Sequence, residues 1–185
     1  MEALNEVKLV TLEKGHVFYQ FQAEEAYINN LMLFIRSGLE NNQHMLIIES
    51  MRNINKVKNR INRIFSVEQR SSIYLVDNFD YYFLNGDFNT QNILNHFKKD
   101  IATIKNLNTS IRTWANVEWT STEPDAEVLK KFESIADDYV LQEGLLSVCA
   151  YSKNVLSDTL INTLEQVHMY VMTDDSIGFS KVYLK

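Results

Sequence analysis

Four histidines and a single cysteine are the side chains of this 185-residue chain best suited to metal binding or nucleophilic chemistry. The histidines show no H-x-x-x-H or H-E-x-x-H spacing, which would place two imidazoles on one helix face; they are His16, His44, His96 and His168. Cys149 lies in an apolar run without a neighbouring base that would activate its thiol. We therefore predict no metal, no cofactor and no catalytic nucleophile, although spacing does not test a metal site built from distant parts of the chain.

The turn expected after the first strand is the natural place to look for a nucleotide site. Ligands of open α/β sheets bind outside the carboxyl ends of the strands, and a P-loop there needs glycines, a lysine and a serine or threonine. Residues 21–25 have the sequence FQAEE and contain none of these, and no G-x-G-x-x-G occurs in the chain. Glu24 and Glu25 would suit a helix dipole but repel a polyphosphate. The sequence thus predicts a protein that does not hydrolyse nucleotides.

Two further side chains, His16 and Glu118, lie at the ends of predicted strands. His16 begins the first strand, where an imidazole is either a hydrogen-bonded structural residue or a group that contacts a ligand or senses pH. Glu118 lies near the carboxyl end of a predicted central strand, where open sheets bind their ligands. Its carboxylate is either the partner of a buried donor or part of a site. Both alternatives stay open for each residue.

The composition, 45% hydrophobic and 23% charged, is that of a globular protein that folds without a disulfide or metal. A formal net charge of −6 disfavours binding to nucleic acid or to an anionic membrane. The single cysteine cannot form an internal disulfide, and the first residues do not resemble a signal peptide. No apolar run approaches the ~18 residues of a transmembrane helix. We therefore expect a cytoplasmic protein.

Basic residues gather in one short stretch between Arg52 and Arg70, in contrast to the acidic balance of the whole chain. Within it, Lys56, Arg60 and Arg63 recur at helical spacing. Such a run is typical of a solvated helix face, and it is also a candidate surface for a protein partner.

Short β-branched or aromatic runs alternate with longer stretches of helical periodicity. We predict strands over residues 16–21, 44–49, 72–76, 111–119, 145–151 and 168–172, and an edge strand over 178–184. Helical stripes lie between them, and one helix is expected to begin with Thr122 as its N-cap, Pro124 in its first turn and Asp125 in a capping box. Strands separated by such helices favour right-handed crossovers. The prediction is one α/β domain over residues 1–185, with a doubly wound, mostly parallel sheet and helices on both faces.

Residues 77–90 interrupt this regularity, because they combine five aromatic side chains with an Asn-Gly turn signal. A long aromatic connection after the carboxyl end of a strand could cover a ligand crevice. It could equally seal one end of the core, which is the more usual role of aromatic residues.

Five motifs, found in the same order along the chain, resemble the MEDS family of sensory domains. Residues 16–27 and 33–41 are similar to the family's histidine-led strand, acidic turn and helix. Residues 82–88 resemble its aromatic connection, and residues 112–119 its arginine-led strand that ends in glutamate and tryptophan. The sequence VCAY at 148–151 is similar to its Cys-Ala-Tyr strand, and His168 lies where a histidine precedes the last core strand. The resemblance covers the chain from about His16 to about Met172.

The resemblance implies a RecA/KaiC-like fold that has lost the phosphate-binding loop, and a role in signal transduction. Such domains are linked to the detection of small organic ligands, hydrocarbon derivatives among them, and occur alone or joined to histidine kinases or DNA-binding modules. We expect a standalone copy that acts on a signalling partner such as a histidine kinase or transcription regulator. Phe18 stands where the family often has a cysteine, and Ala115 and Asn116 replace the usual glycine before Glu118. These departures weaken any metal or thiol role implied by the family's His-x-Cys pattern.

We therefore predict a non-enzymatic sensory domain that binds a small organic ligand and acts on a partner protein. The ligand crevice is expected at the carboxyl ends of the first, third and fourth strands. Its expected polar contacts are His16, Tyr19, Glu24 and Glu118, and its expected aromatic walls are Tyr82, Trp119 and Tyr151. The alternative is a protein-interaction module with no small ligand, which would use the basic helix or the C-terminal edge strand. A divergent ATPase is a third, less favoured hypothesis.

Overall fold

The computed structural model describes residues 8–84, 88–105, 109–120 and 123–185. Seven strands form one sheet at its centre: β1 (Gly15–Phe21), β2 (His44–Glu49), β3 (Ile73–Asp77), β4 (Ile111–Asn116), β5 (Leu146–Ser152), β6 (Tyr170–Met172) and β7 (Ile177–Phe179). Their order is β3-β2-β4-β5-β1-β6-β7, and only the β6–β7 pair is antiparallel. The predicted mostly parallel sheet is thus confirmed, and its C-terminal edge strand β7 pairs antiparallel with β6.

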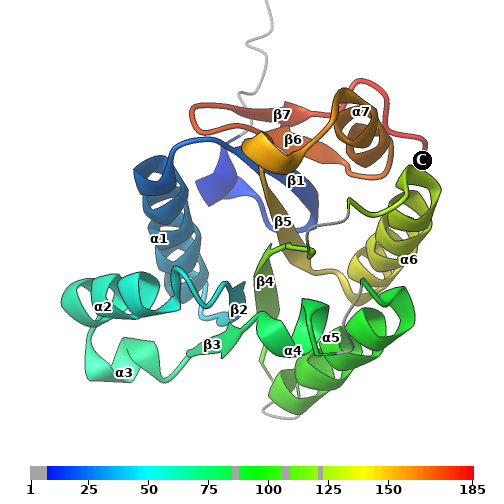
Figure 1. The fold of residues 1–185 in the computed structure, drawn as a ribbon. Helices are drawn as coiled ribbons and strands as arrows, with labels where there is room; N and C mark the ends of the chain where they lie inside the picture. Colours follow the sequence, from blue (N-terminus) through cyan, green and yellow to red (C-terminus); the bar gives the residue numbers. More distant parts are fainter. Residues whose placement is uncertain (1–7, 85–87, 106–108, 121–122) are drawn as a thin grey trace, which may run out of the picture.

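Helices cover both faces of this sheet (Figure 1). The first face is covered by η1 (Leu9–Thr11), α1 (Glu24–Glu40) and α2 (Ile54–Ile64), which α3 (Val67–Arg70) follows. The second face is covered by α4 (Phe79–Tyr82), α5 (Thr90–Lys105), α6 (Ala126–Glu143) and α7 (Asp158–Gln166), and η2 (Lys153–Val155) connects β5 to α7. The chain therefore winds over the sheet on both sides, as a doubly wound fold requires.

Alternation along the strands divides the core into two layers. On β1, Val17 and Tyr19 pack among the residues of α1, whereas Phe18 packs on the opposite side. On β4, Trp114 belongs to the first layer and Ala115 to the second. Because successive side chains of a strand point to opposite faces, each central strand contributes to both layers. This explains the nearly continuous apolar runs in the sequence.

Three predicted boundaries are wrong. Asp125 is the N-cap of α6 and accepts hydrogen bonds from two backbone N–H groups, so Pro124 precedes the helix instead of lying in its first turn; Thr122 lies outside the described residues. Strand β4 ends at Asn116, which places Glu118 and Trp119 beyond it. The edge strand β7 has only three residues and ends before position 180, after which Ser180 caps the α7 end through the Glu165 carbonyl.

The aromatic connection after β3 mainly seals the core. It contains the short helix α4, whose Tyr81 and Tyr82 are buried against α5 and α6. Phe88 stacks on Tyr82 and meets Phe132 of α6 edge to face. Two aromatic residues are exceptions, because Phe79 is exposed and Phe83 lines a surface pocket described below. The Asn-Gly turn signal lies outside the described residues.

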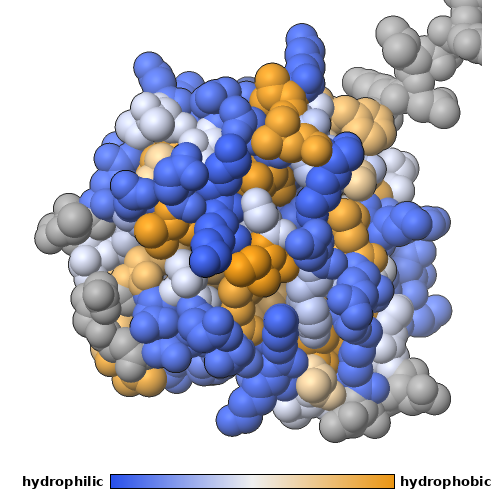
Figure 2. Space-filling view, turned by 90° about the vertical axis from the view of Figure 1, so that its right-hand side faces the viewer, coloured by the Kyte–Doolittle hydropathy of each residue, from blue (hydrophilic) through white to orange (hydrophobic). Residues whose placement is uncertain are grey.

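None of the helices in the described part of the chain has the length and apolarity needed to cross a membrane. Helix α6 exposes the apolar side chains of Val128, Ile135 and Leu141. On the face that carries this helix, hydrophobic groups are interleaved with hydrophilic ones (Figure 2). Scattered apolar residues of this kind are normal on protein surfaces.

Gly15 provides a test of the packing where β1 begins. Its φ is +122°, and a Cβ atom added there would lie 2.7 Å from the Tyr170 ring. We expect Gly15→Ala to lower the free energy of unfolding by about 1–3 kcal/mol, because both the backbone and the ring would have to shift. Gly178→Ala is the matched control, since no atom lies within 4 Å of its added Cβ. Urea unfolding measures both; equal stability of the two variants would contradict the prediction.

Candidate functional site

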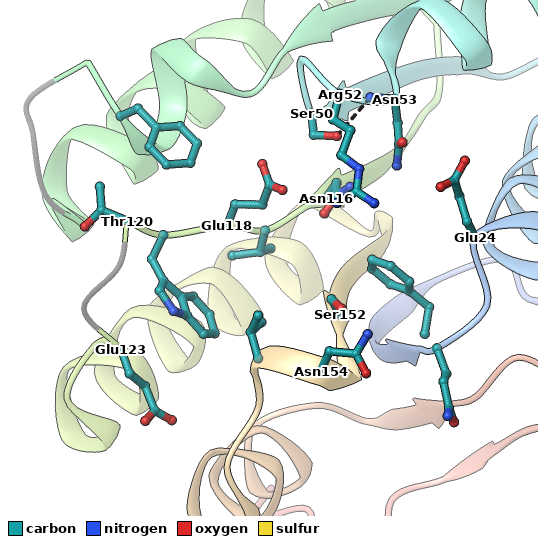
Figure 3. Close-up of a pocket in the computed structure, with 16 residues that line it drawn as sticks. Glu24, Ser50, Arg52, Asn53, Asn116, Glu118, Thr120, Glu123, Ser152 and Asn154 are labelled. Carbon is teal, nitrogen blue, oxygen red and sulfur yellow. Dashed lines mark hydrogen bonds between the residues drawn. The ribbon is translucent and has the colours of Figure 1, made fainter.

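An open pocket of about 530 Å³ lies at the carboxyl ends of β1, β2, β4 and β5 (Figure 3). Residues just beyond these strand ends form most of its wall, and Phe83 comes from the connection after α4. The lining residues are Phe21, Gln22, Glu24, Ser50, Arg52, Asn53, Phe83, Asn116, Val117, Glu118, Trp119, Thr120, Glu123, Ser152, Asn154 and Val155. The volume is in the range of small-molecule sites, and the location is the usual one in open α/β sheets.

The charged side chains of the pocket are three carboxylates and one guanidinium. Glu118 accepts a hydrogen bond from the Asn78 amide at 2.8 Å, and Glu24 forms an ion pair with Lys56 of α2. Arg52 points into the pocket in Figure 3, and no carboxylate among the described residues lies within ion-pair distance of it. Its guanidinium is therefore available to an oxygen-bearing ligand.

A buried hydrogen-bond network holds the pocket floor in place. The Glu49 carboxylate, at the end of β2, accepts bonds from the Tyr27 hydroxyl at 2.5 Å, the Ser50 N–H at 2.7 Å and the Asn116 amide at 2.8 Å. Trp114 donates its indole N–H to the same Tyr27 hydroxyl at 3.0 Å. Burial raises the pKa of Glu49, against the opposing effect of its three donors. The network fixes Ser50 and Asn116, which both line the pocket.

The turn between β1 and α1 already holds an anion, the carboxylate of Asp174. Asp174 follows β6 and accepts hydrogen bonds from the backbone N–H groups of Gln22 at 3.2 Å and Ala23 at 2.8 Å. Its other oxygen accepts the Tyr19 hydroxyl at 2.8 Å. Backbone N–H groups at a helix N-terminus are the donors that bind phosphate in nucleotide sites. Here a side chain of the protein itself occupies them.

The structure divides the seven predicted ligand contacts among three places. Glu24, Glu118 and Trp119 line the pocket. Tyr19 is buried under α1, and burial, with the Asp174 carboxylate, raises its pKa. The other three predicted contacts lie on the second face of the sheet, in or beside the core; they are His16, Tyr82 and Tyr151. The crevice was predicted at the ends of β1, β3 and β4, whereas the pocket lies at the ends of β1, β2, β4 and β5 and includes three of the seven predicted residues.

A second group of polar side chains on that face was missed by sequence reasoning. His16, Glu133, Cys149 and His168 come together with their ligand-type atoms within 4.8 Å of one another. Glu133 and Asp137 are both buried on α6 beside its apolar stripe, and this i, i+4 pair of carboxylates was the available signal. Burial raises the pKa values of Glu133 and Cys149 and lowers that of His168.

Fold and pocket together define a RecA/KaiC-like α/β domain in which the Asp174 carboxylate binds the turn between β1 and α1. The family described as MEDS, the methanogen/methylotroph, DcmR sensory domain, matches residues 15–169. The chain belongs to this family, which supports a sensory or regulatory role in signalling. The family resemblance found in the sequence is thus confirmed.

A structural relative confirms the fold. The KaiC-like protein PH0186 of the hyperthermophilic archaeon Pyrococcus horikoshii OT3 superposes with a TM-score of 0.57, at 15% sequence identity, over 87% of this chain and 71% of that one. At such low identity the likeness concerns the fold alone. No curated protein matches the chain significantly.

The Asp174 contact yields a stability prediction. Asp174→Ala leaves the Gln22 and Ala23 N–H groups and the Tyr19 hydroxyl without their carboxylate partner, so we expect the free energy of unfolding to fall by roughly 1–2 kcal/mol. The neighbouring Asp175 is exposed and serves as the control. If Asp175→Ala destabilised the protein as much as Asp174→Ala in urea unfolding, the structural role assigned to Asp174 would be wrong.

Proposed function

We propose that this domain is a non-enzymatic sensor that binds a small organic molecule in the strand-end pocket and relays its presence to a partner protein. The observation that carries the proposal is the pocket itself: a 530 Å³ space at the ligand-binding edge of the sheet, in a member of a sensory family. A cytoplasmic location stays a prediction from the sequence.

The pocket lining favours a neutral, polar molecule with an apolar part. Three carboxylates against one guanidinium make the site unfavourable for polyanions such as nucleotides. Asn116, Ser152 and Asn154 offer amide and hydroxyl groups for hydrogen bonds, while Phe21, Phe83 and Trp119 offer apolar ring faces. Polar side chains outnumber the apolar ones in this lining, so a ligand would be held mainly by hydrogen bonds, with the aromatic rings as its apolar contacts.

The occupied β1–α1 turn further disfavours the ATPase hypothesis. A triphosphate at this turn would have to displace Asp174 from two backbone N–H groups and would approach Glu24. Both changes cost electrostatic energy, because a bound carboxylate is lost and like charges come together. We therefore propose binding without nucleotide hydrolysis.

Glu24 offers a route from the pocket to the basic surface of α2. Its carboxylate lines the pocket and also pairs with Lys56, and the neighbouring Glu25 pairs with Arg60. A ligand that binds Glu24 competes with Lys56 for it and so changes the charge that α2 presents. This supports a readout by a signalling partner such as a histidine kinase or transcription regulator. Under the alternative, a pure interaction module, the same surface acts with no ligand.

The ligand prediction is tested by a thermal-shift screen of the purified protein against neutral organic compounds and nucleotides. A ligand at about a hundred times its Kd should stabilise the fold by roughly 2.7 kcal/mol. We expect a neutral organic compound to raise Tm in the wild type and much less in Arg52→Ala. Arg36→Ala, an exposed arginine on α1, is the control. Stabilisation by nucleotides alone, or equal loss in both variants, would contradict the proposal.

The proposed link between pocket and α2 gives a separate prediction. Reversing the charges of Lys56 and Arg60 to glutamate removes the partners of Glu24 and Glu25, so the affinity for a compound found in the screen should change several-fold in calorimetric titration. Arg63→Glu lies on the same exposed helix and forms none of the ion pairs among the described residues. It should leave this affinity unchanged. Equal effects of both changes would argue against transmission through Glu24.

A further inference from the structure

We propose that His16, Glu133, Cys149 and His168 form a closed, four-coordinate zinc site in the second core layer. This site is distinct from the strand-end pocket and goes beyond the proposed sensory function. The four residues come from β1, α6, β5 and the segment before β6, so no short sequence motif announces them.

Four of the six distances between the candidate ligand atoms are close to those of a tetrahedral site. His16 Nε2 lies 3.3 Å from Cys149 Sγ and 3.6 Å from Glu133 Oε2. The same Glu133 oxygen lies 3.7 Å from His168 Nε2 and 3.9 Å from Cys149 Sγ. With bonds of about 2.0 Å to nitrogen or oxygen and about 2.3 Å to sulfur, neighbouring ligands of tetrahedral zinc lie roughly 3.3–3.8 Å apart. These four distances lie close to that range, and all candidate ligand atoms lie within 4.8 Å of one another, so zinc would draw the four side chains together.

Contacts behind the ligands aim the imidazoles at the centre of the cluster. His168 Nδ1 lies 2.8 Å from the Leu164 carbonyl oxygen, to which it donates, so the lone pair of Nε2 is free. That Nε2 atom is buried and has no hydrogen-bond partner among the described residues. His16 Nδ1 lies 3.3 Å from an Asp137 carboxylate oxygen, without the geometry of a hydrogen bond, while its Nε2 faces Cys149 and Glu133. A second contact like that of His168 Nδ1 is typical of histidines that bind zinc.

The carboxylate ligand is oriented in the same way. The Tyr151 hydroxyl donates to Glu133 Oε1, and Oε2 is the oxygen that faces both imidazoles and the thiol. Each of these side chains thus keeps one atom that could bind a metal ion and that faces the other candidate ligands. An unpartnered buried imidazole nitrogen beside a buried carboxylate is costly in a folded protein without an ion.

The donor set favours zinc over the other common divalent ions. Two neutral imidazoles, a thiolate and a carboxylate carry two negative charges, which a dication balances inside the core. Magnesium and calcium prefer oxygen ligands and higher coordination numbers, whereas zinc accepts nitrogen, sulfur and oxygen in a tetrahedron. The side chains of His16, Glu133 and His168 are 0% exposed, which describes a structural site without an open position for substrate.

Cys149 marks the side from which an ion reaches the cluster. It keeps some exposed surface along a narrow cavity of about 30 Å³, which His16 and Glu133 also border. The cavity is otherwise walled by apolar residues of α4, α5 and α6, among them Tyr82 and Phe132. Binding of zinc there would tie α6 to two central strands and to the segment before β6.

The test uses the whole protein, stripped of metal by a chelator and dialysed. We expect zinc to rebind at about one ion per chain by elemental analysis and to raise Tm. Cobalt(II), used as a spectroscopic substitute, should give the visible absorption of a four-coordinate ion and a near-ultraviolet thiolate-to-cobalt band. Cys149→Ser should abolish that band, and His168→Ala should lower the zinc content toward zero.

His96→Ala is the control. His96 is partly exposed, pairs with Asp100 and is not one of the four candidate ligands, so this variant should retain full zinc content. The wild-type cobalt spectrum keeps the test decisive even where a ligand variant fails to fold. A six-coordinate cobalt spectrum, the lack of a thiolate band in wild-type protein, or zinc content unchanged in folded His168→Ala would each overturn the proposal.

Discussion

The hydrogen bonds of the Asp174 carboxylate hold the turn between β1 and α1, which borders the strand-end pocket. In a RecA/KaiC-like sheet the β1–α1 turn presents backbone N–H groups at a helix N-terminus, and these groups must be paired. Here Asp174 accepts hydrogen bonds from the N–H groups of Gln22 and Ala23 and from the Tyr19 hydroxyl. These bonds join the β6–β7 hairpin to the turn. The strand-end pocket beside this turn is lined by carboxylates, amides and aromatic rings.

The fold was largely predictable because a doubly wound sheet leaves strong local signals. Each buried strand reads as a short apolar run, and each covering helix shows an apolar stripe. The errors arose at the ends of elements. The Asp125 side chain caps α6 one residue after the proline, and strand β4 ends at Asn116. Such ends depend on single hydrogen bonds, which periodicity does not encode.

The candidate site was predictable only in part, and the parity of strand positions explains one failure. His16 and Tyr19 were assigned to one crevice, yet they are three residues apart on β1 and therefore lie on opposite faces of the sheet. Glu24, Glu118 and Trp119 were placed well because they follow strand ends, which meet at one edge. The partners Asp174 and Glu133 come from distant segments, and only the folded chain brings them near β1.

The short strand β7 has a consequence for how molecules meet one another. An open sheet ends in unpaired N–H and C=O groups that attract strands from other molecules. β7 offers only three residues on one side of the sheet, and the chain then turns back so that Leu184 donates to the Gln166 carbonyl. A neighbouring chain finds little backbone there on which to extend a ladder. This edge of the sheet is thus protected against aggregation by its brevity.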